Sequence, residues 1–290
     1  MNTFLLNIAD FEIHLEAAGN TTILLEEGYR YFCNNTASNP ADLHITAHEG
    51  LPDISGIEKK EIYTAQQENK PFWTIYACKQ EYLFIIYNQE KSREIQQIAF
   101  VDKEYKNWRI YSAIIETENA ICPLKHPMGP LIMYYLTVNH DAIMIHASGV
   151  FDGEKGRVFS GFSGVGKSTM ADIWQKSGAE LINDDRLIVR KINEQFYIYN
   201  TPMFYVDKPK KAPLHHVYLP FHAPENNLKP LSGSKAISRL MAYCIHHPYS
   251  AAFTNKHIDF LIQVAGKLKI AELGFKPDTA VIDFIKTHEQ

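Results

Sequence analysis

The chain has 290 residues, of which 46% are hydrophobic and 21% are charged, and its formal net charge at pH 7 is -4. These values are typical of an ordinary folded protein, and they exclude a disordered or fibrous chain. The negative net charge, without a long basic run, argues against a surface that binds nucleic-acid phosphates.

Targeting and membrane signals are weak along the whole sequence. The first residues, MNTFLLNIADFEIHLE, contain no basic region and reach Asp10 and Glu12 early, so we expect no export signal. The most apolar stretch is broken by Asn139, His140 and Asp141, which excludes a membrane-spanning helix there. The four cysteines form no C-x-x-C pair, and reduced thiols in the cytoplasm fit best.

Residues 1–125 are predicted to form a mainly antiparallel β domain. Runs such as FWTIYACKQEYLFIIYNQ and REIQQIAFVDKEYKNWRIYSAII are rich in aromatic and branched residues and are separated by short polar turns. Such runs are typical of strands joined in hairpins. The segment CPLKHPMGP then punctuates the chain with prolines, and we place the domain boundary there.

Residues 126–290 are predicted to form an α/β (α+β) domain. LIMYYLTVNH has the length of a helix, AIMIHASGVF and GRVFSGF are typical of two strands, and KSTMADIWQKSG is typical of a helix that ends at Gly178. AELIN is typical of another strand, and the Asp pair that follows it is typical of a turn. RLIVRKINEQFYIYN is then predicted to form a hairpin. Beyond it we expect a proline-rich loop region, a helix in SKAISRLMAYCIHH and a C-terminal helix in KPDTAVIDFIKTH.

The strongest motif is GFSGVGKS, which matches the phosphate-binding pattern G-x-x-x-x-G-K-[ST] at every specified position. It stands between a predicted strand and a predicted helix, where backbone N–H groups and the helix N-terminus can hold phosphate oxygens. Lys167 would reach the β and γ phosphates, and Ser168 would bind Mg²⁺. The predicted nucleotide-binding residues are Gly161, Phe162, Ser163, Gly164, Val165, Gly166, Lys167, Ser168 and Thr169.

Three further side chains are candidates for chemistry at the phosphate. Asp184 and Asp185 follow the next predicted strand; one carboxylate can bind the metal while the other accepts a proton, although NDD is equally typical of a plain turn. His146 lies in a strand-like apolar run, where a histidine is more often a core residue than a functional one. Lys208, Lys210 and Lys211 form a basic cluster that fits either a solvated loop or a contact to an anionic substrate.

The segment from His146 to Lys191 resembles the catalytic core of the bacterial HPr serine kinase/phosphorylases. The resemblance rests on the order of a histidine-bearing strand, a hairpin, the GxxGxGKS loop, a helix ending at glycine, a strand and an Asp pair. It implies the mixed-sheet P-loop fold shared with phosphoenolpyruvate carboxykinases. It also implies that Lys167 binds phosphate, that Ser168 binds Mg²⁺, and that Asp185 is the catalytic base beside His146 and Asp184.

The chain departs from that family's pattern at three places. Thr169 stands where the family has an acidic residue, Asp207 is a weak substitute for a downstream acidic magnesium ligand, and Arg239 is a distant candidate for a C-terminal arginine. HPr itself is therefore not assigned as the acceptor. The resemblance is compatible with a homo-oligomer.

We therefore expect an ATP-dependent kinase that uses Mg²⁺ and transfers the γ-phosphoryl group to a hydroxyl of a protein serine or a small molecule. Its catalytic residues would be Asp185, His146, Asp184 and Lys167, and its metal ligands Ser168 and Asp184. Two alternatives stay open: a nucleotide-binding module without turnover, and an ATP or GTP hydrolase in which Asp185 orients water. We expect neither nucleic acid nor a membrane as a partner.

Overall fold

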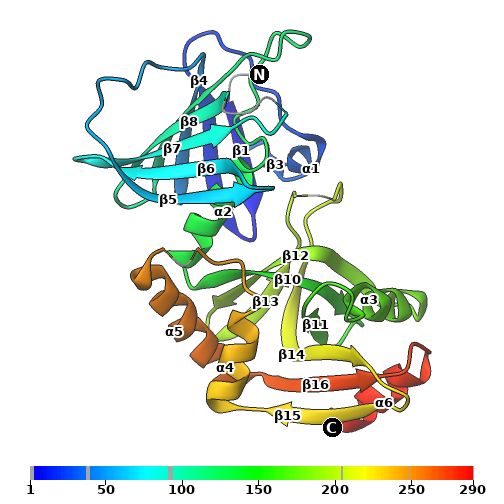
Figure 1. Ribbon diagram of the computed structural model, residues 1–290. Coiled ribbons are helices and arrows are strands. Elements are labelled where there is room, and N and C mark those ends of the chain that lie inside the picture. The colour runs from blue at the N-terminus through cyan, green and yellow to red at the C-terminus, as the bar shows by residue number, and fades with distance from the viewer. Residues whose placement is uncertain (1–2, 37–39, 91–93, 204, 248, 290) are drawn as a thin grey trace. The chain divides into compact units, whose positions relative to one another are not determined.

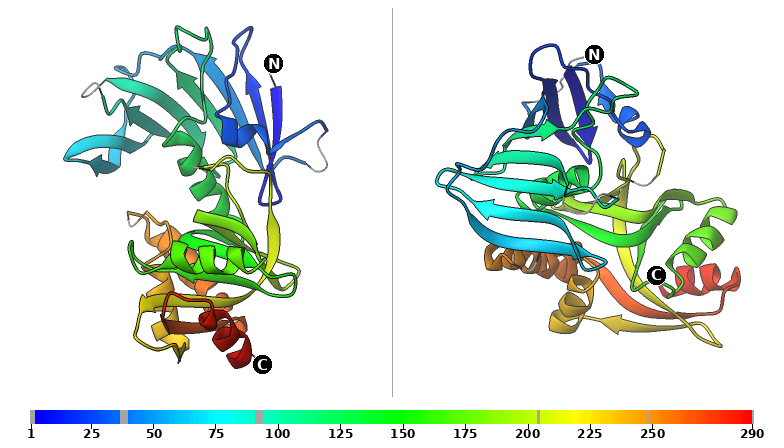
Figure 2. Two further views of the ribbon diagram at one scale, coloured as in Figure 1. Left: turned by 90° about the vertical axis from the view of Figure 1, so that its right-hand side faces the viewer. Right: turned by 45° about the horizontal axis from the view of Figure 1, so that its top comes forward.

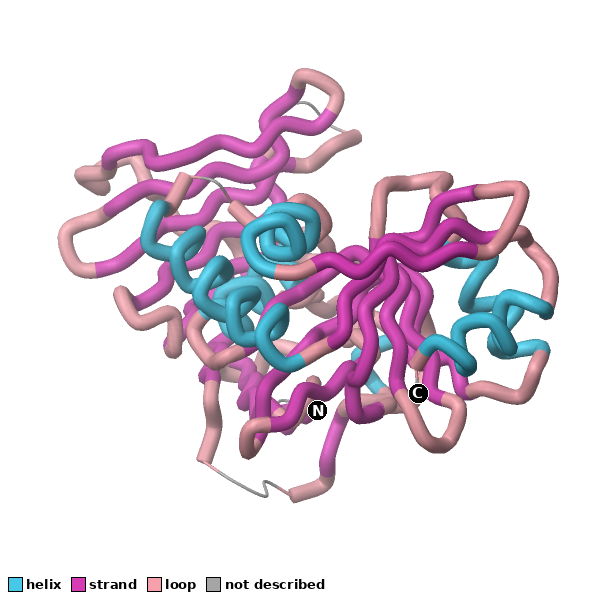
Figure 3. Tube along the Cα trace, turned by 90° about the horizontal axis from the view of Figure 1, so that it is seen from below, coloured by secondary structure: helices cyan, strands magenta, loops and turns pink. Residues whose placement is uncertain are grey.

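The computed structural model describes residues 3–36, 40–90, 94–203, 205–247 and 249–289. By its internal contacts the chain forms two compact units: residues 1–136 with 206–208, and residues 137–205 with 209–290. Strands dominate both units, as Figure 3 shows in magenta, and helices are few. No helix in the described residues is long and apolar enough to cross a membrane.

The N-terminal unit is built on a nine-stranded sheet in the order β3-β1-β2-β4-β9-β8-β7-β6-β5 (Figure 1). The predicted β character is confirmed: β4 pairs in parallel with β2 and with β9, and the other strand pairs are antiparallel. The elements are β1 Thr3–Ile8, β2 Phe11–Ala17, α1 Glu27–Arg30, β3 Cys33–Asn34, β4 Leu43–Glu49, β5 Lys60–Gln67, β6 Lys70–Ala77, β7 Glu81–Tyr87, β8 Ile95–Asp102, β9 Asn107–Ser112 and α2 Met128–Val138.

Helix α2 explains why the units divide at 136/137, whereas the predicted boundary lay at 125/126. The ring of Tyr135 stacks on Tyr105 at 4.4 Å between centroids and meets Phe84 edge-on at 5.4 Å. These contacts tie most of the helix to the N-terminal sheet. The assignment of an activity to either unit stays a prediction.

The C-terminal unit is a mixed sheet in the order β11-β10-β12-β13-β14-β16-β15. Figure 2 shows its strands from two further sides, coloured from green to red along the chain. Strand β14 also pairs with β11, so that five of the strands close into a ring. The elements are β10 Ala142–Phe151, β11 Gly156–Ser160, α3 Lys167–Lys176, β12 Glu180–Ile192, β13 Gln195–Tyr199, β14 Lys211–His222, β15 Asn227–Leu231, α4 Gly233–Met241, α5 Ala251–Lys267, β16 Lys269–Phe275 and α6 Ala280–His288.

Two hydrophobic cores lie on the two sides of this sheet. Helices α4 and α5 pack on one side, with Leu240 and Leu261 in the core, and helices α3 and α6 on the other, with Trp174 and Val281 (Figure 1). The predicted end of α3 is confirmed, since Gly178 has φ +93°, a left-handed conformation that suits glycine.

Two predictions about this unit were wrong. The segment after Tyr199 was predicted as a proline-rich loop, but it contains β14 and β15. The prolines in these strands lie where the strand has no hydrogen-bonded neighbour on one side, so the missing N–H breaks no ladder. Pro230 is in the edge strand β15, and Pro220 lies beyond the last residue of β14 that pairs with β11. The Asp pair is not a turn: β12 runs through Asp184 and Asp185 without a break and turns only at Asn193 and Glu194.

Candidate functional site

The loop between β11 and α3 has the backbone conformation that its glycines predict. Gly164 and Gly166 have φ of +84° and +101°, values that residues with a side chain rarely adopt. A Cβ at Gly166 would also lie 2.5 Å from the ring of Phe275 in β16. Glycine is therefore required at position 166 both by conformation and by packing, at the residue that directly precedes α3.

Lys167 is folded back onto this loop. Its side chain is buried, and Nζ donates to the carbonyl oxygens of Gly161 and Phe162, both at 3.0 Å. Burial lowers the pKa of the Lys167 ammonium, while the negative charges of Asp184 and Asp185 oppose that shift. The lysine of the loop and the two acids therefore interact electrostatically in one cluster.

The acids reach this cluster from the middle of β12, which lies antiparallel to β10. Ser148 of β10 is the cross-strand partner of Asp184, and its hydroxyl donates to Asp184 Oδ1. Asp185 is the partner of Ala147. The prediction that the two acids follow the end of a strand was wrong. They lie in the middle of β12, and its pairing with β10 brings them next to His146.

His146 contacts the acid pair. Its Nδ1 lies 3.4 Å from Asp185 Oδ1, with both side chains partly exposed. Burial, followed by the positive charge of Lys167, lowers the pKa of the His146 imidazole, and the charge of Asp185 opposes this. The imidazole is therefore mostly neutral at pH 7. The structure thus brings together His146, Lys167, Asp184 and Asp185, the four predicted catalytic residues.

Three residues near this cluster were not predicted. Arg186 places Nε 3.7 Å from Asp185 Oδ2, and the Tyr205 hydroxyl donates to the backbone oxygen of Asp184 at 3.2 Å. Burial and the two acids raise the pKa of Tyr205. Ser148 lies two residues after His146, the spacing that places two side chains on one face of a strand, and this spacing could have identified it.

The remaining predicted residues divide into two groups. Ser168 and Thr169 lie exposed in the first turn of α3, open to a ligand. Two lysines of the basic cluster make structural contacts: Lys210 Nζ donates to the Leu181 backbone oxygen at 2.7 Å, and Lys211 lies 4.5 Å from the centre of the Tyr197 ring.

A pocket of about 320 Å³ adjoins the phosphate-binding loop. Arg239, a distant candidate in the sequence, lies in its wall and binds Glu272 at 2.7 Å. Phe162 and Tyr243 also line it and meet edge-on, 5.1 Å between ring centroids. This pocket offers an arginine and two aromatic side chains beside the loop.

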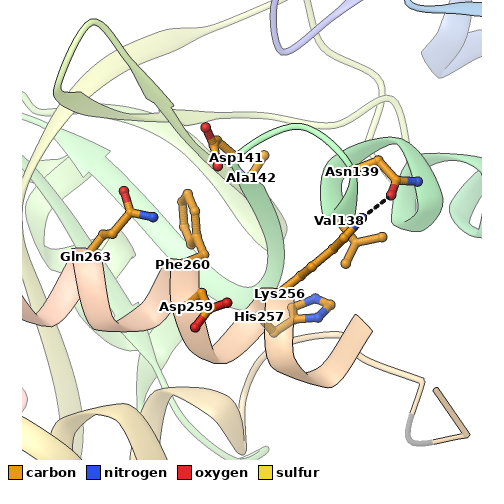
Figure 4. Close-up of a pocket in the computed structure, with 9 residues that line it drawn as sticks. All are labelled: Val138, Asn139, Asp141, Ala142, Lys256, His257, Asp259, Phe260 and Gln263. Carbon is orange, nitrogen blue, oxygen red and sulfur yellow. Dashed lines mark hydrogen bonds between the residues drawn. The ribbon is translucent and has the colours of Figure 1, made fainter. Parts of the chain in front are cut away.

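A second pocket in this unit, of about 210 Å³, lies between the start of β10 and α5 (Figure 4). Lys256 spans one end of it and donates to Asn139 Oδ1 at 2.6 Å. None of the predicted site residues lines it. Within the described residues, no group of three or more histidine, cysteine or acidic side chains could hold a metal ion by itself.

No protein-family model matches the chain, and no curated protein is significantly similar to it. Among solved structures, the chain is similar to the Hpr(Ser) kinase/phosphatase from Coxiella burnetii, with a TM-score of 0.29 and 10% sequence identity. The match covers 50% of this chain and 95% of that chain. At these values the similarity is distant, and no residue role is transferred from it.

Proposed function

We propose that the C-terminal unit binds ATP with Mg²⁺ and transfers the γ-phosphoryl group to a hydroxyl of a protein serine or a small molecule. The observation that carries this proposal is the position of Lys167: its ammonium lies in a glycine-rich loop before a helix, and this loop follows Ser160, which pairs across the sheet with Ala147, the residue that also pairs with Asp185. Phosphoryl transfer needs mainly positioning and neutralisation of charge, and this cluster offers groups for both.

The phosphate chain would lie along the loop, residues 161–168. Its oxygens would accept hydrogen bonds from backbone N–H groups and from Lys167 Nζ, which would give up the carbonyls of Gly161 and Phe162. Charge-assisted bonds to phosphate are stronger than bonds to neutral carbonyls, so the exchange is favourable. Ser163, Gly164 and Thr169 are exposed and leave the loop open to the ligand.

The donor set fits Mg²⁺. This ion prefers oxygen ligands and in phosphotransferases is held by one or two carboxylates together with substrate phosphates. The exposed hydroxyl of Ser168 and the carboxylate of Asp184 would hold it. Bound there, Mg²⁺ would supply neutralisation of phosphate charge.

Asp185 would act as the general base. As the acceptor oxygen forms its bond to the γ-phosphorus, the bond from that phosphorus to the bridging oxygen breaks, ADP leaves, and the acceptor proton passes to the Asp185 carboxylate. The neighbouring His146 is mostly neutral at pH 7, so it can hold this carboxylate in place without neutralising it. Asp185 then remains able to take a proton.

The experiment that tests the proposal incubates the full chain with γ-labelled ATP, Mg²⁺ and lysate fractions separated by size. Label on a protein or on a small molecule is the expected result. Release of free phosphate in every fraction, with no labelled acceptor, would show a hydrolase instead. Binding of ATP without any movement of label would show a nucleotide-binding module.

A further inference from the structure

A buried polar network lies directly behind the acid pair. Ser148 is fully buried, Thr201 is 1% exposed and Asn183 is 5% exposed, although each carries a group that water would solvate. Burying such groups is unfavourable unless their hydrogen bonds are satisfied within the protein. The targets of their hydrogen bonds therefore indicate what the network holds in place.

The network lies beside a β-bulge in the pairing of β10 with β12. Gly149 pairs with Asn183 and Val150 with Leu181, so Ile182 has no partner in β10. A bulge of this kind bends a strand and turns the neighbouring side chains, which is why bulges are frequent beside active sites. Here it lies immediately before the two acids.

Asn183 fixes the backbone on both sides of the acids. Its Oδ1 accepts from the Asp184 backbone N–H at 2.9 Å, and its Nδ2 donates to the Arg186 backbone oxygen at 2.7 Å. The Thr201 hydroxyl donates to the same Arg186 oxygen at 3.1 Å. The buried side chains of Asn183 and Thr201 therefore hold the backbone on both sides of Asp184 and Asp185.

Ser148 acts on the side chain of Asp184. Its hydroxyl donates to Oδ1, and in the described part of the chain no hydrogen bond to the second oxygen, Oδ2, is found. One carboxylate oxygen is therefore held by a rigid strand while the other is left for a ligand. Outer hydrogen bonds of this kind orient carboxylates that bind metals.

We infer that Ser148 is a positioning residue that orients the Asp184 carboxylate toward the Mg²⁺ of bound nucleotide, with Asn183 holding the bulge that presents it. This inference rests on the proposed function, because it needs the nucleotide and its metal at the loop. Ser148 does not touch the acceptor or the transferred group. Its effect is on the Mg²⁺ dependence of binding.

The test measures ATP binding to the full chain by calorimetry as Mg²⁺ is varied. For Ser148→Ala, the Mg²⁺ concentration that gives half of the full effect should rise about tenfold, the lower end of the range for an outer-shell partner of a metal ligand. Binding of ATP in excess EDTA should not change. An unchanged Mg²⁺ dependence in a folded Ser148→Ala protein would overturn the inference.

The matched control is Ser112→Ala. Ser112 is also a buried serine in a strand, but it lies in the N-terminal unit and accepts a hydrogen bond from Gln97 at 3.0 Å. It should lose stability without any change in Mg²⁺ dependence. If Ser148→Ala does not fold, Ser148→Cys replaces it, because the thiol has a similar size and is a weak donor.

A double-mutant cycle separates orientation of Asp184 from general loosening of the strand. In a chain that already carries Asp184→Asn, Ser148→Ala should add no further change in Mg²⁺ dependence. Additive effects would contradict the inference. If the unmodified chain binds no nucleotide under any condition, the proposed function fails, whereas normal binding with no effect of Ser148 removes only this inference.

Discussion

Two clusters in the C-terminal unit use the same kinds of side chain in different surroundings. Each contains a buried cation, two carboxylates and a histidine: Lys167 with Asp184, Asp185 and His146, and Arg157 with Asp152, Glu289 and His216. The sheet and its helices bury the second cluster, whereas the first is partly open. Residue type alone therefore does not separate a functional cluster from a structural one.

The Arg157 cluster is closed and satisfied. Arg157 makes a two-bond contact with Glu289, Nε to Oε1 at 2.8 Å and Nη2 to Oε2 at 2.6 Å, and Nη1 lies 3.0 Å from Asp152 Oδ2. The guanidinium also lies 4.3 Å from the centre of the Trp174 ring of α3. Burial opposes the charge of Arg157, but the bonds to Glu289 outweigh it and raise the pKa of Arg157.

The Lys167 cluster is loose by comparison. Burial lowers the pKa of Lys167, and the carboxylates beside it do not offset that effect. The contacts of Asp185 with His146 and Arg186 are 3.4 and 3.7 Å long. Groups that are held near one another without being fully paired can still bind a ligand, which is the physical reason for placing function at this cluster.

The largest expected effect is on stability at the closed cluster. Arg157→Met would remove the buried cation that bonds to Glu289 and Asp152, and we expect the free energy of unfolding to fall by about 3 kcal/mol. Lys155, 3.6 Å from Glu289, and Lys286, 3.4 Å from Asp152, would remain as longer contacts from more exposed side chains. Urea denaturation measures it. Lys167→Met should cost far less, because its ammonium donates to two neutral loop carbonyls and the carboxylates near it are partly exposed. Equal losses in the two variants would erase the distinction between the clusters.

The next effect is on catalysis at the open cluster. Asp185→Asn should slow phosphoryl transfer about 100-fold, the usual scale for a general base, while nucleotide binding and stability stay near those of the unmodified chain. Single-turnover assays with labelled ATP measure the rate. Asp152→Asn is the matched control and should behave in the opposite way, with lower stability and an unchanged rate per folded molecule. Transfer at the normal rate in Asp185→Asn would remove the base from the mechanism.

The closed cluster should also make stability depend on pH. Burial lowers the pKa of His216 from its ordinary 6.5 to about 4. Between these values the unfolded chain binds the proton and the folded chain does not, so the free energy of unfolding falls as the pH drops through this window. In His216→Gln, the loss of unfolding free energy between pH 6.5 and pH 4 should be smaller by on the order of 2 kcal/mol. Denaturation at several pH values measures this loss.

The smallest effect concerns a third ion pair, on the surface of α3. Lys176 Nζ lies 2.6 Å from Asp172 Oδ2, as short as the Arg157 contact, but 73% and 56% of the two side chains are exposed. Lys176→Ala should therefore change the free energy of unfolding by less than about 0.5 kcal/mol. A loss above 2 kcal/mol in thermal or urea denaturation would show that distance, and not burial, sets the strength of these pairs.

What the sequence could predict follows from the range of the interactions involved. The strand, glycine loop and helix at residues 156–176 are encoded locally, and the structure confirms these elements. The continuity of β12 through Asp184 could not be read from NDD, because it depends on pairing with β10, and the residues that pair there, Ser148 and Asp184, are 36 positions apart.

The closed cluster and the longest helix lay outside the prediction. Arg157 and Glu289 meet across 132 positions of sequence, which no local pattern reports. Helix α5, Ala251–Lys267, buries residues that follow one another at helical spacing: Phe253, His257, Phe260, Leu261 and Val264. The sequence carries this stripe, and the prediction missed it. The Arg157 cluster depends on tertiary contacts that local patterns do not report, whereas helix α5 could have been predicted from the spacing of its apolar residues.

The most direct test of the account measures thermal unfolding of the full chain with and without Mg-ATP, for the unmodified protein and for Lys167→Ala. At ATP one hundred times above its dissociation constant, the unmodified chain should gain about 2.7 kcal/mol of stability. Lys167→Ala should fold and gain nothing. Equal stabilisation of both proteins, or none in the unmodified chain, would contradict the claim that this loop and its lysine bind a nucleoside triphosphate.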